Sequence, residues 1–135
     1  MITEDYVSFE VAKLLREKGF NENTSVNYFV GDDKLRGCAV GEMIYHKRLE
    51  EDTHLIPAPT LQMAMKWLRL VHGLHVEPIP DCFDYKHGDI HDGWFCEITH
   101  LSDMSYDADY DSHKKHKTCE EACEDAIKFC LENLI

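Results

Sequence analysis

The chain of 135 residues carries 26 acidic against 14 basic residues, giving a net charge of −12, and 44% of its residues are hydrophobic. This hydrophobic share excludes an intrinsically disordered chain, and no apolar run approaches the ~18–20 residues that span a bilayer. The negative charge argues against a surface that binds nucleic acid through direct phosphate contacts. The length predicts a single domain over residues 1–135.

The first predicted element is a helix over residues 8–19. Ser8 is a suitable N-cap, and Gly19 can take the left-handed conformation that ends a helix. Apolar residues recur there at three- and four-residue spacing. The predicted inward face consists of Phe9, Val11, Ala12, Leu14 and Leu15.

Several short strands are predicted between residues 25 and 56. In the first, Val26, Tyr28 and Val30 alternate with Asn27 and Phe29, which predicts that the first three face the core. Turns are predicted at residues 31–34 and 47–52, and further strands at 38–40, 43–45 and 53–56.

The most apolar predicted helix covers residues 61–72, and it follows a proline-containing segment and precedes Gly73. Trp67 flanks its inward side, and the helix is predicted to lie at the centre of the core. That inward side is predicted to consist of Leu61, Ala64, Met65, Leu68, Val71 and His72.

Beyond this helix, residues 74–77 predict a strand that Pro78 and Pro80 either end or place at a sheet edge. Residues 81–92 predict a loop or loose hairpin. Residues 94–101 predict a strand, and its Trp94, Cys96 and Ile98 share one face.

Residues 103–117 are polar and predict a loop, with a short strand around Tyr106. The last helix is predicted from Cys119 to the end of the chain, because Thr118 and Glu121 have the spacing of a capping box. Its predicted inward side consists of Cys119, Ala122, Cys123, Ala126, Ile127, Cys130, Leu131 and Leu134. The whole pattern predicts an α+β fold in the order α-β-β-α-β-β-α, with about three helices packed on a small, mostly antiparallel sheet.

Three stretches carry a resemblance to a known family: residues 6–20, the proline-threonine-to-tryptophan stretch and its continuation at residues 58–76, and the acidic C-terminal helix. Together they resemble a family of small proteins of uncharacterised function from gut Bacteroides genomes, their phages and mobile elements. The resemblance covers about half of the chain. It implies a cytoplasmic bacterial or phage setting, and it carries over no activity, cofactor or site residue.

The chain has six cysteines, at positions 38, 82, 96, 119, 123 and 130. Its acidic N-terminus lacks the basic and apolar regions of a secretory signal, so a cytoplasmic location with free thiols is predicted.

Residues 103–123 are rich in Asp, His and Cys and contain two candidate metal sites. Asp107, Asp109 and Asp111 alternate as in the first half of a calcium loop, but Ser112 and Thr118 stand where such a loop needs Gly and Glu. This favours a solvated acidic loop, with Lys114, Lys115 and Lys117 offsetting part of its charge.

The second candidate is a zinc site that combines His113 and His116 with Cys119 and Cys123. The ligand spacing does not match a zinc finger. Both cysteines also fall on the predicted inward side of the last helix, which favours space-filling thiols.

Two further groups have a functional and a structural interpretation. Trp67 with Lys66 and Arg69 could anchor a partner, but a tryptophan at the edge of the core is favoured. A cysteine nucleophile would need Cys82 or Cys96 beside an imidazole, and no motif singles out such a pair. The scattered histidines are His72, His75, His87, His91 and His100.

No catalytic, cofactor-binding or metal-ligating residue is therefore assigned. The sequence favours a non-enzymatic accessory or protein-interaction protein associated with a phage or mobile element, with an unidentified protein as partner. Two alternatives remain open: a metal-binding protein or metal-dependent enzyme that uses residues 103–123, and a homo-oligomer, such as a homodimer, that covers an edge strand or the Trp67 helix.

Overall fold

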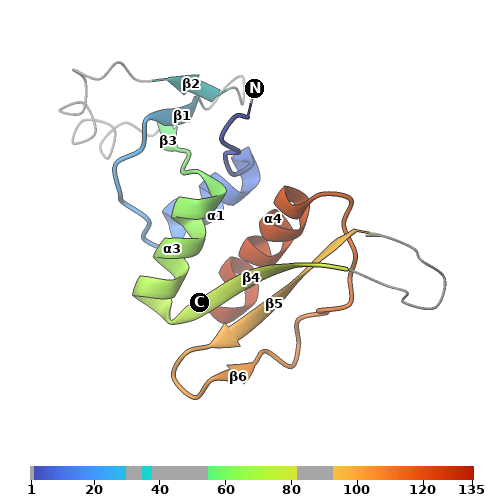
Figure 1. Ribbon diagram of the computed structural model, residues 1–135. Coiled ribbons are helices and arrows are strands. Elements are labelled where there is room, and N and C mark those ends of the chain that lie inside the picture. Colours follow the sequence, from blue (N-terminus) through green and yellow to red (C-terminus); the bar gives the residue numbers. More distant parts are fainter. Residues whose placement is uncertain (1, 30–34, 38–54, 82–92) are drawn as a thin grey trace. The chain divides into compact units, whose positions relative to one another are not determined.

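The computed structural model describes residues 2–29, 35–37, 55–81 and 93–135 (Figure 1). The chain divides into two compact units, Met1–Ala64 and Met65–Ile135. The single domain over residues 1–135 stays a prediction.

The N-terminal unit contains helix α1 (Phe9–Glu17). The Ser8 hydroxyl caps it by accepting a hydrogen bond of 3.2 Å from the backbone N–H of Val11. Gly19 follows with φ +95°. Val11, Ala12 and Leu15 are buried. The predicted helix, its cap and the centre of its inward face are therefore confirmed.

Three antiparallel strands of the N-terminal unit form a sheet in the order β2-β1-β3, namely β1 (Val26–Phe29), β2 (Leu35–Gly37) and β3 (Leu55–Pro57). Tyr28 pairs with Leu35 on one side and Ile56 on the other. The predicted turns at 31–34 and 47–52 and the predicted strands at 38–40 and 43–45 lie outside the described residues.

The predicted alternation in β1 is wrong at one position. Asn27 is only 2% exposed, although it follows half-buried Val26 and precedes buried Tyr28. Because successive strand residues point to opposite faces, β1 is covered on both faces. A simple inward–outward pattern therefore does not apply to it.

Main-chain hydrogen bonds anchor the segment before α1 to the segment before helix α3 (Leu61–His72). The N–H of Val7 donates to the carbonyl of Pro59, and the N–H of Leu61 donates to the carbonyl of Asp5. The Tyr28 hydroxyl adds a buried hydrogen bond of 2.6 Å to the Val7 carbonyl.

Helix α3 (Leu61–His72) begins at Thr60, whose hydroxyl accepts from the N–H of Met63. Two predictions about its sides are wrong. Val71 is 59% exposed, whereas Trp67 is buried rather than flanking. The prediction extended the three- and four-residue spacing of the inward side into the last turn of the helix, which includes Val71. The helix instead ends before Gly73 (φ +63°), and the residue that is buried next is Leu74.

The second sheet belongs to the C-terminal unit and has the antiparallel order β4-β5-β6, with β4 (Leu74–Pro80), β5 (Trp94–His100) and β6 (Ser105–Tyr106). Of the two predicted alternatives for the prolines, a strand end or an edge position, the second holds, because β4 runs through Pro80 at the edge of the sheet. The Leu101 N–H donates to the Gly73 carbonyl, and the Asp81 N–H donates to the Gly93 carbonyl. Because hydrogen-bonded positions alternate along an antiparallel strand, the nitrogens of Pro78 and Pro80 point away from β5. Neither proline therefore interrupts the ladder.

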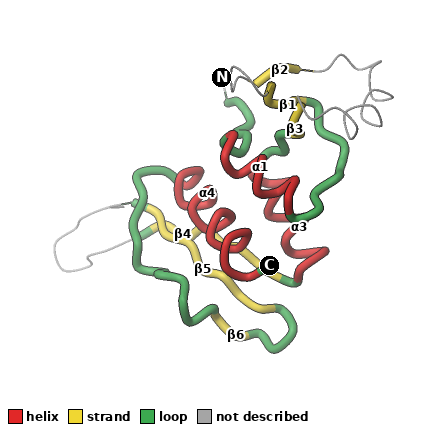
Figure 2. Tube along the Cα trace, turned by 180° about the vertical axis from the view of Figure 1, so that it is seen from behind, coloured by secondary structure: helices red, strands yellow, loops and turns green. Residues whose placement is uncertain are grey.

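Helix α4 (Cys119–Phe129) packs against β4 and β5, which Figures 1 and 2 show from opposite sides. It continues as a π-helical turn, η2 (Cys130–Leu134). The Thr118 hydroxyl accepts from the N–H of Glu121 at 3.1 Å, which confirms the predicted cap. The buried residues of this element are Ala122, Cys123, Ala126, Ile127, Cys130 and Leu131.

The α+β class is confirmed: the described residues form three α-helices and antiparallel strands, and these strands make two small sheets instead of one. Among the described helices, none has the length and apolar character that crossing a bilayer requires.

Candidate functional site

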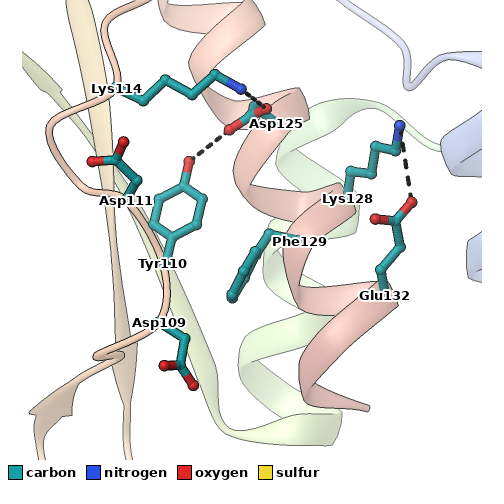
Figure 3. Close-up of a pocket in the computed structure, with 8 residues that line it drawn as sticks. All are labelled: Asp109, Tyr110, Asp111, Lys114, Asp125, Lys128, Phe129 and Glu132. Carbon is teal, nitrogen blue, oxygen red and sulfur yellow. Dashed lines mark hydrogen bonds and ion pairs between the residues drawn. The ribbon is translucent and has the colours of Figure 1, made fainter.

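A pocket of about 320 Å³ opens beside α4 in the C-terminal unit (Figure 3). One wall comes from the loop that joins β6 to α4, and the other from α4 and its π-helical continuation. The lining residues are Asp109, Tyr110, Asp111, Lys114, Asp125, Lys128, Phe129 and Glu132.

Asp125 on α4 holds the loop wall of the pocket. One of its carboxylate oxygens accepts a hydrogen bond of 3.0 Å from the Tyr110 hydroxyl, and the other accepts one of 3.0 Å from the Lys114 ammonium. The imidazole of His116 lies 3.6 Å away. Burial and the negative charge of Asp125 raise the pKa of Tyr110, so its hydroxyl stays protonated as a donor.

The floor of the pocket is aromatic. The rings of Tyr110 and Phe129 lie 4.9 Å apart between centroids with a tilt of 58°. Tyr110 is buried, while Phe129 is half-buried and borders the open space. On the helix wall, the ammonium of Lys128 lies 3.9 Å from the Glu132 carboxylate.

Asp107 fixes the start of the loop. One carboxylate oxygen accepts from the backbone N–H groups of Asp109 (3.1 Å) and Tyr110 (2.9 Å), and the other lies 2.7 Å from Nε2 of His100 on β5. Burial acts to raise the pKa of Asp107, but these hydrogen bonds outweigh it and hold the pKa below its ordinary value. The Asp107 N–H also donates to the Ile98 carbonyl.

The end of the loop is fixed to the opposite end of β5. His116 and Trp94 exchange two backbone hydrogen bonds of 2.7 and 2.8 Å, and the Lys115 ammonium pairs with Asp81 at 2.7 Å. Gly93 is required beside this bridge. A Cβ there would lie 2.8 Å from the His116 carbonyl oxygen, and its φ of +136° suits only glycine.

The thiols of the described residues, at Cys96, Cys119, Cys123 and Cys130, are free. Burial raises the pKa of Cys119 to about 11 and that of Cys130 to about 12, with contributions from Cys123 and Asp107 respectively. A hydrogen bond with Cys96 and burial raise the pKa of Cys123. Cys119, Cys123 and Cys130 are therefore protonated at neutral pH and are weak nucleophiles.

The predicted metal-site residues do not gather around one point. Asp107 turns to backbone donors and His100, whereas Asp109 and Asp111 border the pocket. His116 approaches Asp125. Across residues 2–29, 35–37, 55–81 and 93–135, no three His, Cys, Asp or Glu side chains are arranged to hold a metal ion.

The remaining predicted candidates that the structure describes are not among the residues that line the pocket. The ring of His72 packs against buried Trp67 at 4.7 Å, and Lys66 beside it is exposed. His75 lies on β4 opposite Thr99 of β5. The further candidates Cys82, His87 and His91 lie outside the described residues.

Sequence reasoning missed Tyr110, Asp125, Phe129 and Glu132 as site residues. One signal was available. Phe129 and Glu132 follow Asp125 at helical spacing on the side of α4 that the apolar stripe leaves uncovered. The loop that faces them has no periodicity to reveal the match.

A scan against protein-family models found no match, and searches of curated proteins and of solved structures also found none.

Proposed function

We propose that this protein is a non-enzymatic interaction protein that binds a basic side chain of a partner protein in the pocket beside α4. The composition of the pocket carries the proposal. An aromatic floor of Tyr110 and Phe129 is bordered by the carboxylates of Asp109, Asp111 and Glu132. An arginine or lysine is attracted both by such carboxylates and by the negative face of an aromatic ring.

The pocket lining has a net negative charge that a bound cation would offset. Four carboxylates and two lysines line it, which leaves an excess of two negative charges. Lys114 is bound to Asp125, and Lys128 lies near Glu132. The net charge of −12 adds a long-range field that attracts basic partners.

The size and openness of the pocket favour a side chain of another protein over an enclosed substrate. About 320 Å³ is at the lower end of the range for small-molecule sites. The thiols of Cys119, Cys123 and Cys130 are protonated at neutral pH, which argues against a cysteine nucleophile among these three. The resemblance to phage and mobile-element proteins is consistent with an accessory role toward a phage or host protein.

The test is a ¹H–¹⁵N NMR titration with three peptides that share the sequence Gly-Leu-Xaa-Leu-Gly, where Xaa is arginine, lysine or glutamine. We expect the arginine and lysine peptides to shift the amide signals of residues 109–114 and 128–132, and to bind at least about tenfold more tightly than the glutamine peptide, a difference of roughly 1.4 kcal/mol. Glu132→Gln and Asp109→Asn should each weaken binding by about threefold to tenfold.

The matched control is Glu22→Gln, which removes the same charge from an exposed residue of the N-terminal unit. It should leave the affinity unchanged. Equal weakening by Glu22→Gln and Glu132→Gln would reduce the effect to net charge and overturn the pocket as the site. The absence of shifts with the arginine peptide at millimolar concentration would overturn the proposal itself.

A further inference from the structure

Among the residues that the structure describes, the sheet β4-β5-β6 has a helix packed on one face, and that helix is α4 (Figures 1 and 2). The buried residues of β4 and β5 point toward it, namely Leu74, Val76, Cys96 and Ile98. Because side chains alternate along a strand, the residues between them form the opposite face, the outer face. The outer face consists of His75, Glu77, Ile79, Phe95, Glu97, Thr99 and Tyr106.

Two glutamates stand directly opposite each other on the outer face. Glu77 of β4 pairs with Glu97 of β5, a position that brings the Cβ atoms to roughly 4.5–5.5 Å. Glu77 is exposed and Glu97 is half-buried. Like charges in this position repel each other and destabilise a sheet. The outer face contains no lysine or arginine, and the ion pairs of the described residues involve other carboxylates.

Apolar side chains flank the two glutamates. On one side, Ile79 and Phe95 are direct cross-strand neighbours, and both are half-buried. On the other side, Tyr106 of β6 pairs with Thr99 and is 68% exposed. Aromatic side chains are enriched in protein–protein interfaces. The outer face therefore offers apolar contact at both ends and an uncompensated negative centre.

We propose that the outer face binds a basic amphipathic helix of a partner protein, with a lysine or arginine placed over Glu77 and Glu97 and apolar residues at both ends. The charge selects this occupant. A second copy packed face to face would bring four glutamates together, and nucleic acid or an anionic membrane would be repelled. This inference is independent of the pocket beside α4.

The dimensions of the sheet favour a helix over an added strand. β4 and β5 have seven residues each, which extend about 23 Å, the length of about 15 helical residues. Three strands span about 10 Å, which is close to the diameter of a helix. Strand addition is disfavoured at both edges, since β4 lacks N–H donors at Pro78 and Pro80 and β6 has two residues.

The test is a ¹H–¹⁵N NMR titration at about 0.15 M salt with a peptide of leucine and lysine, about 15 residues long, whose leucines recur at three- and four-residue spacing. We expect it to shift the amide signals of residues 75–79, 95–99 and 105–106. A peptide of the same composition in scrambled order, and one with glutamate in place of lysine, should each bind at least about tenfold more weakly.

Variants separate binding from folding. Glu77→Gln combined with Glu97→Gln should weaken peptide binding about fivefold to tenfold, yet raise the melting temperature of the free protein by about 1–4 °C, because it removes the repulsion. Tyr106→Thr should weaken binding by about threefold. The control combines Glu4→Gln with Glu22→Gln, which removes the same charge from exposed residues of the N-terminal unit, and it should leave the affinity unchanged.

Three outcomes would overturn the outer face as a docking site. The first is the absence of shifts at millimolar peptide. The second is a set of shifts confined to residues 109–114 and 128–132, which would place the peptide in the pocket beside α4 and leave the proposed function intact. The third is equal weakening by the two double variants, which would reduce the effect to net charge.

Discussion

Residues 5–7 of the N-terminal unit and residues 107–117 of the C-terminal unit are irregular segments held in different ways. Main-chain hydrogen bonds between Val7 and Pro59 and between Asp5 and Leu61 hold the first. The second relies mainly on the carboxylates of Asp107, Asp125 and Asp81, beside the backbone bridge at His116. Main-chain bonds depend little on side-chain identity, whereas a carboxylate anchor can be removed by one substitution or by one proton.

The way in which residues 107–117 are anchored affects the pocket. A loop held by carboxylates does not have to follow a strand, so it leaves polar side chains free to border the pocket. The cost is that a few acidic residues determine whether the pocket exists.

Asp107→Ala should destabilise the C-terminal unit by about 3 kcal/mol, because it leaves two backbone N–H groups and His100 without their acceptor. Urea denaturation followed by tryptophan fluorescence measures it, since Trp67 and Trp94 both belong to this unit. The matched control is Asp111→Ala, which removes one exposed bond to the His113 N–H and should cost less than about 1 kcal/mol. Equal losses for the two variants would contradict the anchoring role of Asp107.

Acid should remove the contribution of Asp107. Its pKa is lowered from 3.8 in the folded state, so its stabilisation is complete above that value and is lost as the pH falls through the lower folded pKa. The difference in melting temperature between the wild type and Asp107→Asn should therefore shrink below pH 3.8. The lowered pKa of Asp103 is present in both proteins and cancels. A difference that stays constant down to the acid-unfolding range would show that Asp107 does not act through its charge.

Two tyrosine-to-phenylalanine changes compare the units by the same chemistry, with the smallest expected effects. Tyr28→Phe should cost about 1–2 kcal/mol, because the buried Val7 carbonyl loses its 2.6 Å hydrogen bond from the hydroxyl. Tyr110→Phe should cost about 1 kcal/mol or less, since Asp125 keeps Lys114. Thermal unfolding followed by circular dichroism compares them. A larger loss for Tyr110→Phe would reverse the comparison.

Local signals predicted much of the fold. Ser8 and Thr118 were recognised as helix caps because capping depends on residues within one turn, and Pro78 and Pro80 marked an edge strand because proline lacks an N–H. Val71 was predicted to face inward but is exposed. Helical periodicity cannot show at which residue the helix ends and the next strand takes over the contacts with the core.

The candidate site was less accessible to sequence reasoning. Tyr110 and Phe129 are 19 positions apart, and their meeting depends on how the loop is anchored at Asp107 and His116. The pairing of His100 with Asp107 follows from the β5–β6 register, in which Thr99 faces Tyr106. A register cannot be read from one sequence where the strand has only two residues.

The two prolines of β4 have a consequence for self-association. Their nitrogens point away from β5 and carry no hydrogen, so the β4 edge of this sheet lacks donors at two alternate positions. An incoming strand, whether from an identical chain or from an unfolding neighbour, would find a discontinuous template there. Fibril growth by strand addition at β4 is thereby disfavoured, and this protection comes from the backbone alone, independent of pH or salt.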